Sequence, residues 1–112
     1  MASLSVGEVG SNIVHIEGIL REPDVQVWLS PIIESVHRSA VRAALAEVIL
    51  DIRKLEYANA AAWRCLVQWL HLIHRDVKAN YTLRIRSQPA YRWQVVGMST
   101  LRIFGDEHLI IE

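Results

Sequence analysis

Apolar and polar positions repeat along the chain with two periods, which predict two kinds of element. A spacing of three to four residues between apolar positions predicts amphipathic helices over residues 25–40, 60–74 and 90–97. Alternation, or a short apolar run, predicts strands over residues 3–9, 12–18, 48–52, 81–86 and 108–111. The expected fold class is therefore α/β. It is one mixed β-sheet packed with helices, in the order β-β-α-β-α-β-α-β, within a single domain spanning residues 1–112.

The junction around Asn59 is the most informative stretch. Val48 to Ile52 is a short apolar run bounded by charge, which predicts a central parallel strand buried on both faces. A charged loop then leads to Asn59, a residue type that caps helix starts by accepting a backbone hydrogen bond. Ligands and partners of α/β folds commonly bind beyond the carboxyl ends of such strands, so this junction is the first candidate for a binding surface.

The helix expected over residues 60–74 has a broad apolar face. Its predicted core stripe contains Trp63, Leu66, Val67, Leu70, Ile73 and His74, and the opposite stripe contains Arg64, Gln68, His71 and Arg75. Cys65, Trp69 and Leu72 lie beside the core stripe and widen it. This width exceeds what one sheet face needs, so Trp69 and Leu72 are candidate interface residues. Trp28, Trp63 and Trp93 fall on core stripes and are expected to be buried.

Turn and cap residues predict the remaining boundaries. Gly10-Ser11 is expected to join two antiparallel N-terminal strands, and Gly18 to end the second. Asp24 is a candidate N-cap, but Pro31 requires either a kink or a later start near Ser30. Ser87 is expected to cap a short third helix that Gly97 ends.

Composition narrows the partner classes. Twelve basic and twelve acidic residues cancel, so no basic excess supports nucleic-acid binding. The single Cys65 fits a reducing compartment. No secretory signal and no apolar run of membrane-spanning length is present, so no membrane partner and a cytoplasmic location are expected.

The sequence offers no set of residues typical of catalysis. His71 and His74 have a spacing that can bind a metal, but no third ligand is near, so no metal site and no cofactor are expected. Cys65 is interpreted as a packed thiol, and Asp51 as a carboxylate that caps or pairs with an arginine. The expectation is a domain that is not an enzyme.

The element order and several segments resemble the STAS domain family, the fold of bacterial anti-sigma factor antagonists. The segments are Val48-Ile49-Leu50-Asp51-Ile52, Leu55-Glu56-Tyr57-Ala58-Asn59, the helix containing Leu66, Val67 and Leu70, Leu83-Arg84-Ile85, and the helix ending in Val96-Gly97-Met98. The resemblance covers nearly the whole chain, although its motifs are mostly hydrophobic. It implies partner switching, in which the domain binds a switch kinase or anti-sigma factor until a Ser or Thr at the start of the helix is phosphorylated.

This chain departs from the family at that position. Asn59 matches the first residue of the family pattern, but Ala60 and Ala61 occupy the places of the hydroxyl residues and Ala62 that of a common glycine. Three explanations remain open: an unregulated member, regulation at another residue such as Ser99 or Thr100, or engineered alanines.

The leading hypothesis is a regulatory interaction domain in bacterial signal transduction and transcription regulation. Its partner is an anti-sigma factor, a switch kinase or a related STAS protein. The expected partner-binding residues are Tyr57, Asn59, Ala60, Ala61, Trp63, Arg64, Gln68 and His71. The alternative is a ligand-binding or homo-oligomeric scaffold module of the same fold, because an apolar edge beside the last predicted strand favours self-association.

Overall fold

The computed structural model describes the backbone of residues 2–6 and 12–112 and the side chains of residues 12–105 and 107–112. Its strands are β1 Ala2–Val6, β2 Ile13–Leu20, β3 Glu47–Asp51, β4 Leu55–Ala58, β5 Thr82–Arg86 and β6 Leu109–Ile111. Its helices are α1 Val25–Arg42, α2 Ala60–Arg75, α3 Arg92–Gly105 and the short 3-10 turn η1 Asp106–His108. The predicted Gly10-Ser11 turn lies outside the described residues.

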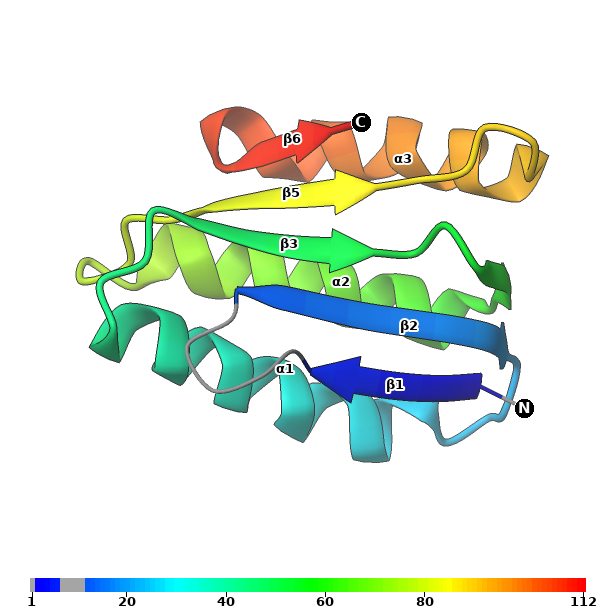
Figure 1. Ribbon diagram of the computed structural model, residues 1–112, viewed down its shortest axis with the longest axis horizontal. Coiled ribbons are helices and arrows are strands. Elements are labelled where there is room, and N and C mark those ends of the chain that lie inside the picture. Colours follow the sequence, from blue (N-terminus) through cyan, green and yellow to red (C-terminus); the bar gives the residue numbers. More distant parts are fainter. Residues whose placement is uncertain (1, 7–11) are drawn as a thin grey trace.

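The strands form one mixed sheet in the order β1-β2-β3-β5-β6, and β4 also pairs with β2 (Figure 1). β1 is antiparallel to β2, and every other pair is parallel. This confirms the predicted α/β class and the predicted antiparallel pairing of the two N-terminal strands. The predicted order of elements lacks one strand, because β4 forms where a loop was expected.

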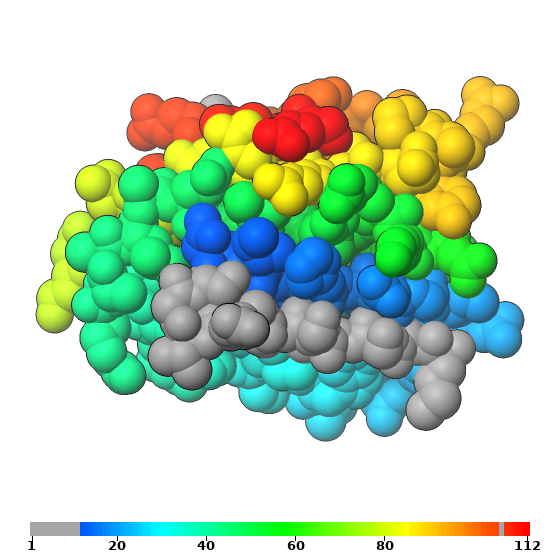
Figure 2. All heavy atoms as spheres, in the orientation of Figure 1, coloured from blue at the N-terminus to red at the C-terminus, as the bar shows by residue number. Residues whose placement is uncertain are grey.

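All three α-helices lie on the same face of the sheet (Figure 1). From β2 onward the chain moves through β3 and β5 to β6 in one direction, and right-handed crossovers then place every connecting helix on one side. On the other face of the sheet, the outward-pointing side chains of β2, β3 and β5 are not covered by any helix of the described chain (Figure 2). The fold therefore has two layers, one of strands and one of helices.

β3 and β4 pair with successive parts of β2, with an interruption between them. β3 pairs with Ile13–His15, and β4 pairs with Gly18–Leu20 after a register shift. Gly18 has φ 94°, which favours glycine, and its amide donates to the Lys54 carbonyl (3.1 Å) across the interruption. Gly18 therefore does not end the strand as predicted. It allows β2 to continue past the bulge and meet β4.

The core lies between the helices and the inner face of the sheet. Alternate strand residues point inward and are buried, namely Val14, Ile16, Val48, Leu50, Leu83 and Ile85. Their neighbours in sequence, such as His15, Glu47 and Arg84, point to the open face and are only half-buried. β3 is a central parallel strand as predicted, but helices cover only its inner face, so the expectation of cover on both faces is wrong. Its outward residues Ile49 and Asp51 are nevertheless only 7% and 5% exposed.

α1 and α3 differ from their predicted bounds. α1 begins directly after Asp24, whose side chain makes no cap hydrogen bond, and it includes Pro31 in its second turn. The alternative start near Ser30 is therefore wrong. α3 begins at Arg92 and passes through Gly97 to Gly105, so Gly97 does not end it and Ser87 does not cap it. Ser87 instead donates through Oγ to the Glu112 carbonyl (2.7 Å).

The buried face of α2 is rotated relative to the predicted stripe. Its buried residues are Ala61, Ala62, Cys65, Leu66, Trp69, Leu70 and Ile73, whereas Trp63 and Val67 are half-buried and His74 is exposed. The predicted stripe was displaced toward the α3 side of the helix. α2 is the central helix and packs on the sheet and on both neighbours, so the residues assigned to its flank form the middle of its buried face.

Candidate functional site

Asn59 starts α2 and ties it to two other segments. Its Oδ1 accepts from the Ala62 amide (3.0 Å), which confirms the predicted cap. Its Nδ2 donates to the Glu22 carbonyl (3.0 Å), and its own amide donates to the Leu20 carbonyl (2.8 Å). Through both ends of its amide, Asn59 therefore positions the candidate surface at the start of α2.

The alanines after Asn59 differ in exposure. Ala60 is exposed at the first helical position, whereas Ala61 and Ala62 are buried. The expectation that Ala61 contacts a partner is therefore wrong in this structure. Of the two positions where the resemblance places hydroxyl residues, only position 60 would present a hydroxyl to solvent.

A row of aromatic rings joins the start of α2 to α3. The ring of Tyr57 in β4 contacts Trp93 (centroids 6.3 Å apart), and Trp93 contacts Trp63 at 5.9 Å. The Trp63 ring also packs directly on Gly97. Further along the helices, His71 contacts Phe104 (5.9 Å). Trp63 and Trp93 are half-buried in this row and not fully buried as predicted.

α3 adds an apolar surface that the sequence patterns did not reveal. The exposed side chains of Val96 and Ile103 are seven residues apart and so share one side of the helix, next to the half-exposed Phe104. The sequence pattern predicts a helix end at Gly97. Ile103 therefore lies outside the predicted helix, and its seven-residue spacing from Val96 is not part of that pattern. We call Tyr57, Ala60, Trp63, Arg64, Trp93, Val96, Ile103 and Phe104 the α2–α3 surface.

One polar atom in this surface lacks a partner. Among the described buried side-chain nitrogen and oxygen atoms, only Nε1 of Trp93 makes no hydrogen bond. An unpaired buried N–H group costs about 1–3 kcal/mol. A bound acceptor group that reached it would offset this cost.

Trp69 belongs to the core and not to an interface. Its side chain is 1% exposed, and its Nε1 donates to the Tyr81 hydroxyl (2.9 Å). The same hydroxyl lies 2.7 Å from Nδ1 of His37, whose Nε2 meets Asp76 at 2.9 Å. Burial raises the pKa of Tyr81 to about 12. The interface role predicted for Trp69 is wrong because the helix is rotated.

Gln68, His71 and Leu72 line a second feature, a groove of about 470 Å³ between α1 and α2. Ser30, Glu34 and Arg75 also line it. Cys65 lies at its base, 1% exposed, with its Sγ 3.6 Å from Oγ of Ser30, which confirms the packed thiol. The predicted site residues therefore divide between this groove and the α2–α3 surface, although Arg64 and His71 are exposed on the same helix face.

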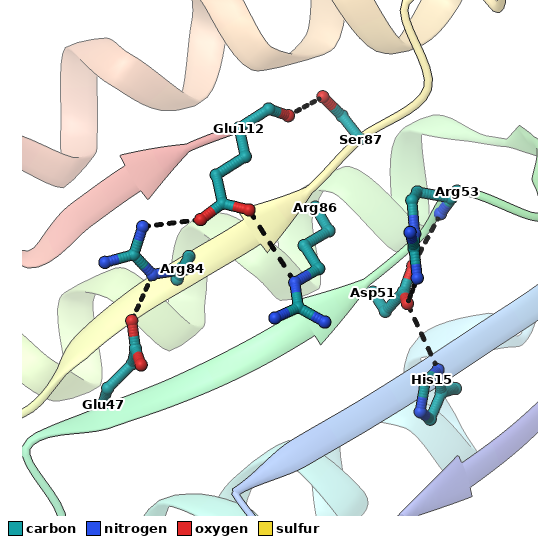
Figure 3. Close-up of polar contacts among 8 residues, drawn as sticks. All are labelled: His15, Glu47, Asp51, Arg53, Arg84, Arg86, Ser87 and Glu112. Atoms are coloured by element: carbon teal, nitrogen blue, oxygen red, sulfur yellow. Dashed lines mark hydrogen bonds and ion pairs between the residues drawn. The ribbon is translucent and has the colours of Figure 1, made fainter.

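Charged side chains on the open face of the sheet are paired with one another. Figure 3 shows Arg84 between Glu47 and Glu112, with Arg86 directed at the other oxygen of Glu112. Asp51 lies between Arg53 (2.7 Å) and His15 (3.5 Å). Hydrogen bonds from the Arg53 side chain hold the pKa of the Asp51 carboxyl below its ordinary value. This confirms the predicted arginine pair, in which the carboxylate is a weak base.

Among the side chains of residues 12–105 and 107–112, no three His, Cys, Asp or Glu residues gather closely enough to hold a metal ion. None of the helices in the described part of the chain combines the length and apolarity needed to cross a bilayer. No protein-family model, curated protein or solved structure matches this chain.

Proposed function

We propose that this domain is an interaction module of a bacterial partner-switching system that binds a switch kinase, an anti-sigma factor or a related STAS protein. The binding surface is the α2–α3 surface. The resemblance to STAS domains supports the class of partner. The observation that carries the proposal is the gathering of exposed apolar side chains around α3, where Val96 and Ile103 are 69% and 76% exposed. Contiguous exposed apolar side chains commonly mark protein interfaces.

Binding through this surface is not controlled by phosphorylation at the start of α2. Ala60 is the one exposed position of the alanine run, and it has no hydroxyl. The domain in this proposal therefore stays in its binding state unless control acts elsewhere. Ser99 and Thr100 are both exposed on α3, and Thr100 lies between Val96 and Ile103 in helical spacing, so a phosphate there would disturb the same surface.

The test compares two valines of equal exposure. Val96 on α3 and Val27 on α1 are each 69% exposed, so an aspartate at either position replaces a similar amount of exposed apolar surface. Tagged wild-type domain is used to recover partners from the source cells, and the affinity of the purified partner is measured by calorimetry. We expect Val96→Asp to weaken binding at least tenfold and Val27→Asp to leave it unchanged. Equal effects, or recovery of no kinase, anti-sigma or STAS partner, would contradict the proposal.

A phosphate mimic at position 60 gives a second measurement. We expect Ala60→Glu to stabilise the domain by about 0.3–1 kcal/mol, because a carboxylate near the start of a helix interacts favourably with its dipole. The same variant should weaken partner binding, because it places charge within the α2–α3 surface. Unchanged affinity in the stabilised variant would exclude the start of α2 from the binding surface.

The groove between α1 and α2 supports a second candidate function, the binding of a small ligand. Its rim carries both charges, Glu34 and Arg75, which suits a zwitterionic compound. A ligand retained in native mass spectrometry and lost in Arg75→Ala would favour this function. Absence of any bound species would exclude it.

A further inference from the structure

Charge is distributed unevenly over the helices. α2 and α3 contain Arg64, Arg75, Arg92 and Arg102 and not one of the twelve acidic residues of the chain. The segment between Ser87 and Tyr91 has no acidic residue either. A chain with zero formal net charge thus has a purely cationic pair of helices.

These arginines are also unpaired, in contrast to those on the sheet. Arg53, Arg84 and Arg86 each form an ion pair across the open face. No carboxylate of the described residues lies within ion-pair distance of the four arginines on α2 and α3. Their charge is therefore available to a partner.

The same helices carry the apolar surface. Eight large hydrophobic side chains are exposed among the described residues, and four of them lie on α3: Val95, Val96, Ile103 and Phe104. A fifth, Tyr57, contacts Trp93 of α3. Apolar contacts and unpaired cations thus occur together here.

Two of the four arginines adjoin the aromatic row. Arg64 and Arg92 are next in sequence to Trp63 and Trp93, whose rings are in contact. Arg75 lines the groove between α1 and α2, and Arg102, nine residues after Trp93, lies on the opposite side of α3. Membrane-binding surfaces instead gather about four to eight cations in one cluster.

We propose that the α2–α3 surface binds an amphipathic acidic segment of a partner protein, with apolar side chains on the aromatic row and Asp or Glu residues near Arg64 and Arg92. The segment binds as a helix whose apolar side chains are three, four and seven residues apart. Its carboxylates supply the charges that Arg64 and Arg92 lack among the described residues. This inference rests on the proposed function and specifies the partner's chemistry.

The test selects binders from a displayed library of random peptides of about 16 residues, roughly four helical turns. We expect enriched sequences with an apolar stripe flanked by acidic residues. Their affinity should fall about tenfold or more in Arg64→Glu/Arg92→Glu and recover when acidic residues of the peptide are changed to lysine. Arg38→Glu/Arg42→Glu, two exposed arginines on α1, is the matched control and should leave the affinity unchanged.

Other outcomes overturn the inference. Enriched peptides that are neutral or basic, no enrichment, or equal sensitivity to the α1 control variant would each do so. Binding to vesicles of phosphatidylserine and phosphatidylcholine without peptide enrichment would assign the surface to a membrane. A second copy as occupant would appear as a dimer in light scattering that Arg64→Glu/Arg92→Glu dissociates. If acidic peptides bind but no cellular partner is recovered, the proposed function fails and the inference stands. A recovered partner that tolerates Arg64→Glu/Arg92→Glu gives the reverse result.

Discussion

Gln94 shows how one side chain can hold two elements together. It is completely buried, and its Nε2 donates to the carbonyls of Ile52 (2.8 Å) and Leu55 (2.9 Å). Its Oε1 accepts from the Gln88 amide (2.8 Å). The first turn of α3 is thereby fixed to the interruption between β3 and β4. A buried glutamine with every polar atom satisfied is a specific structural device.

Replacing this amide by a carboxylate tests its role. We expect Gln94→Glu to lower the free energy of unfolding by about 3 kcal/mol, because the Ile52 and Leu55 carbonyls each lose a hydrogen bond and an acidic group is buried against them. The Ile52 carbonyl keeps the Leu55 amide as a second donor. Gln68→Glu, an exposed position on α2, should change stability by less than about 0.5 kcal/mol. Urea denaturation of both variants measures the difference, and similar values would contradict the assigned hydrogen bonds.

The Asp51–Arg53 pair predicts how stability depends on pH. The pKa of Asp51 is lowered by Arg53 in the folded state, so the pair contributes stability above the ordinary carboxyl pKa. That contribution is lost as the pH falls through the lowered folded value. We expect Arg53→Gln to reduce the loss of stability between about pH 5 and strongly acidic solution. Urea midpoints across this range measure it, and Lys54→Gln, an exposed neighbour, should retain the wild-type profile.

At the scale of elements, the contact between α2 and α3 depends on the absence of a methyl group. A Cβ added at Gly97 would lie 2.2 Å from Cζ2 of Trp63. Glycine inside a helix is normally unfavourable by roughly 0.5–1 kcal/mol relative to alanine. Its presence here is explained by the close packing of the two helices, which brings the ring of Trp63 onto the α3 backbone.

A double-mutant cycle separates these two effects. We expect Gly97→Ala to destabilise the domain by about 1–3 kcal/mol, since overpacking outweighs the gain in helix propensity. In a Trp63→Ala background the same change should become neutral or stabilising, because the obstructing ring is gone. Chemical denaturation of the four proteins gives the coupling free energy. Equal effects of Gly97→Ala in both backgrounds would refute the close contact.

Periodicity predicted most elements because their burial is one-sided. The strand at Val48 and the helix after Asn59 were found from local pattern and a cap residue alone. The four residues of β4 were missed because their pairing with β2 depends on Gly18, more than thirty residues earlier. α3 was cut short because Gly97 resembles a helix end, although its role is to contact Trp63.

At the scale of the whole molecule, the sheet order predicts a gradient of local stability. β3 and β5 are paired on both sides, whereas β6 is a three-residue edge strand paired with β5 alone. We expect the amides of Val48–Leu50 and Leu83–Ile85 to show the slowest hydrogen exchange, and those of Leu109–Ile111 to exchange faster. Amide exchange measured by NMR tests this order. Greater protection in Leu109–Ile111 would contradict the strand arrangement.

The candidate site was predictable only in part. Tyr57, Ala60, Trp63 and Arg64 were expected from the α2 junction, and the structure leaves their side chains exposed or half-buried on one side of it. Trp93, Val96, Ile103 and Phe104 were not expected, because the packing of α3 beside α2 joins segments about thirty residues apart. Ala61 and Trp69 were predicted to face a partner but are buried. A small rotation of a central helix about its axis moves residues from its flank into its buried face.

The side-chain hydrogen bonds of Asn59 have a consequence for evolution. The side chain both accepts from Ala62 and donates to Glu22. Aspartate supplies the acceptor but not the donor. Selection for folding therefore favours asparagine over aspartate here, whether or not a partner is bound. In an alignment, variation at position 60 would therefore be the more telling record of changing regulation.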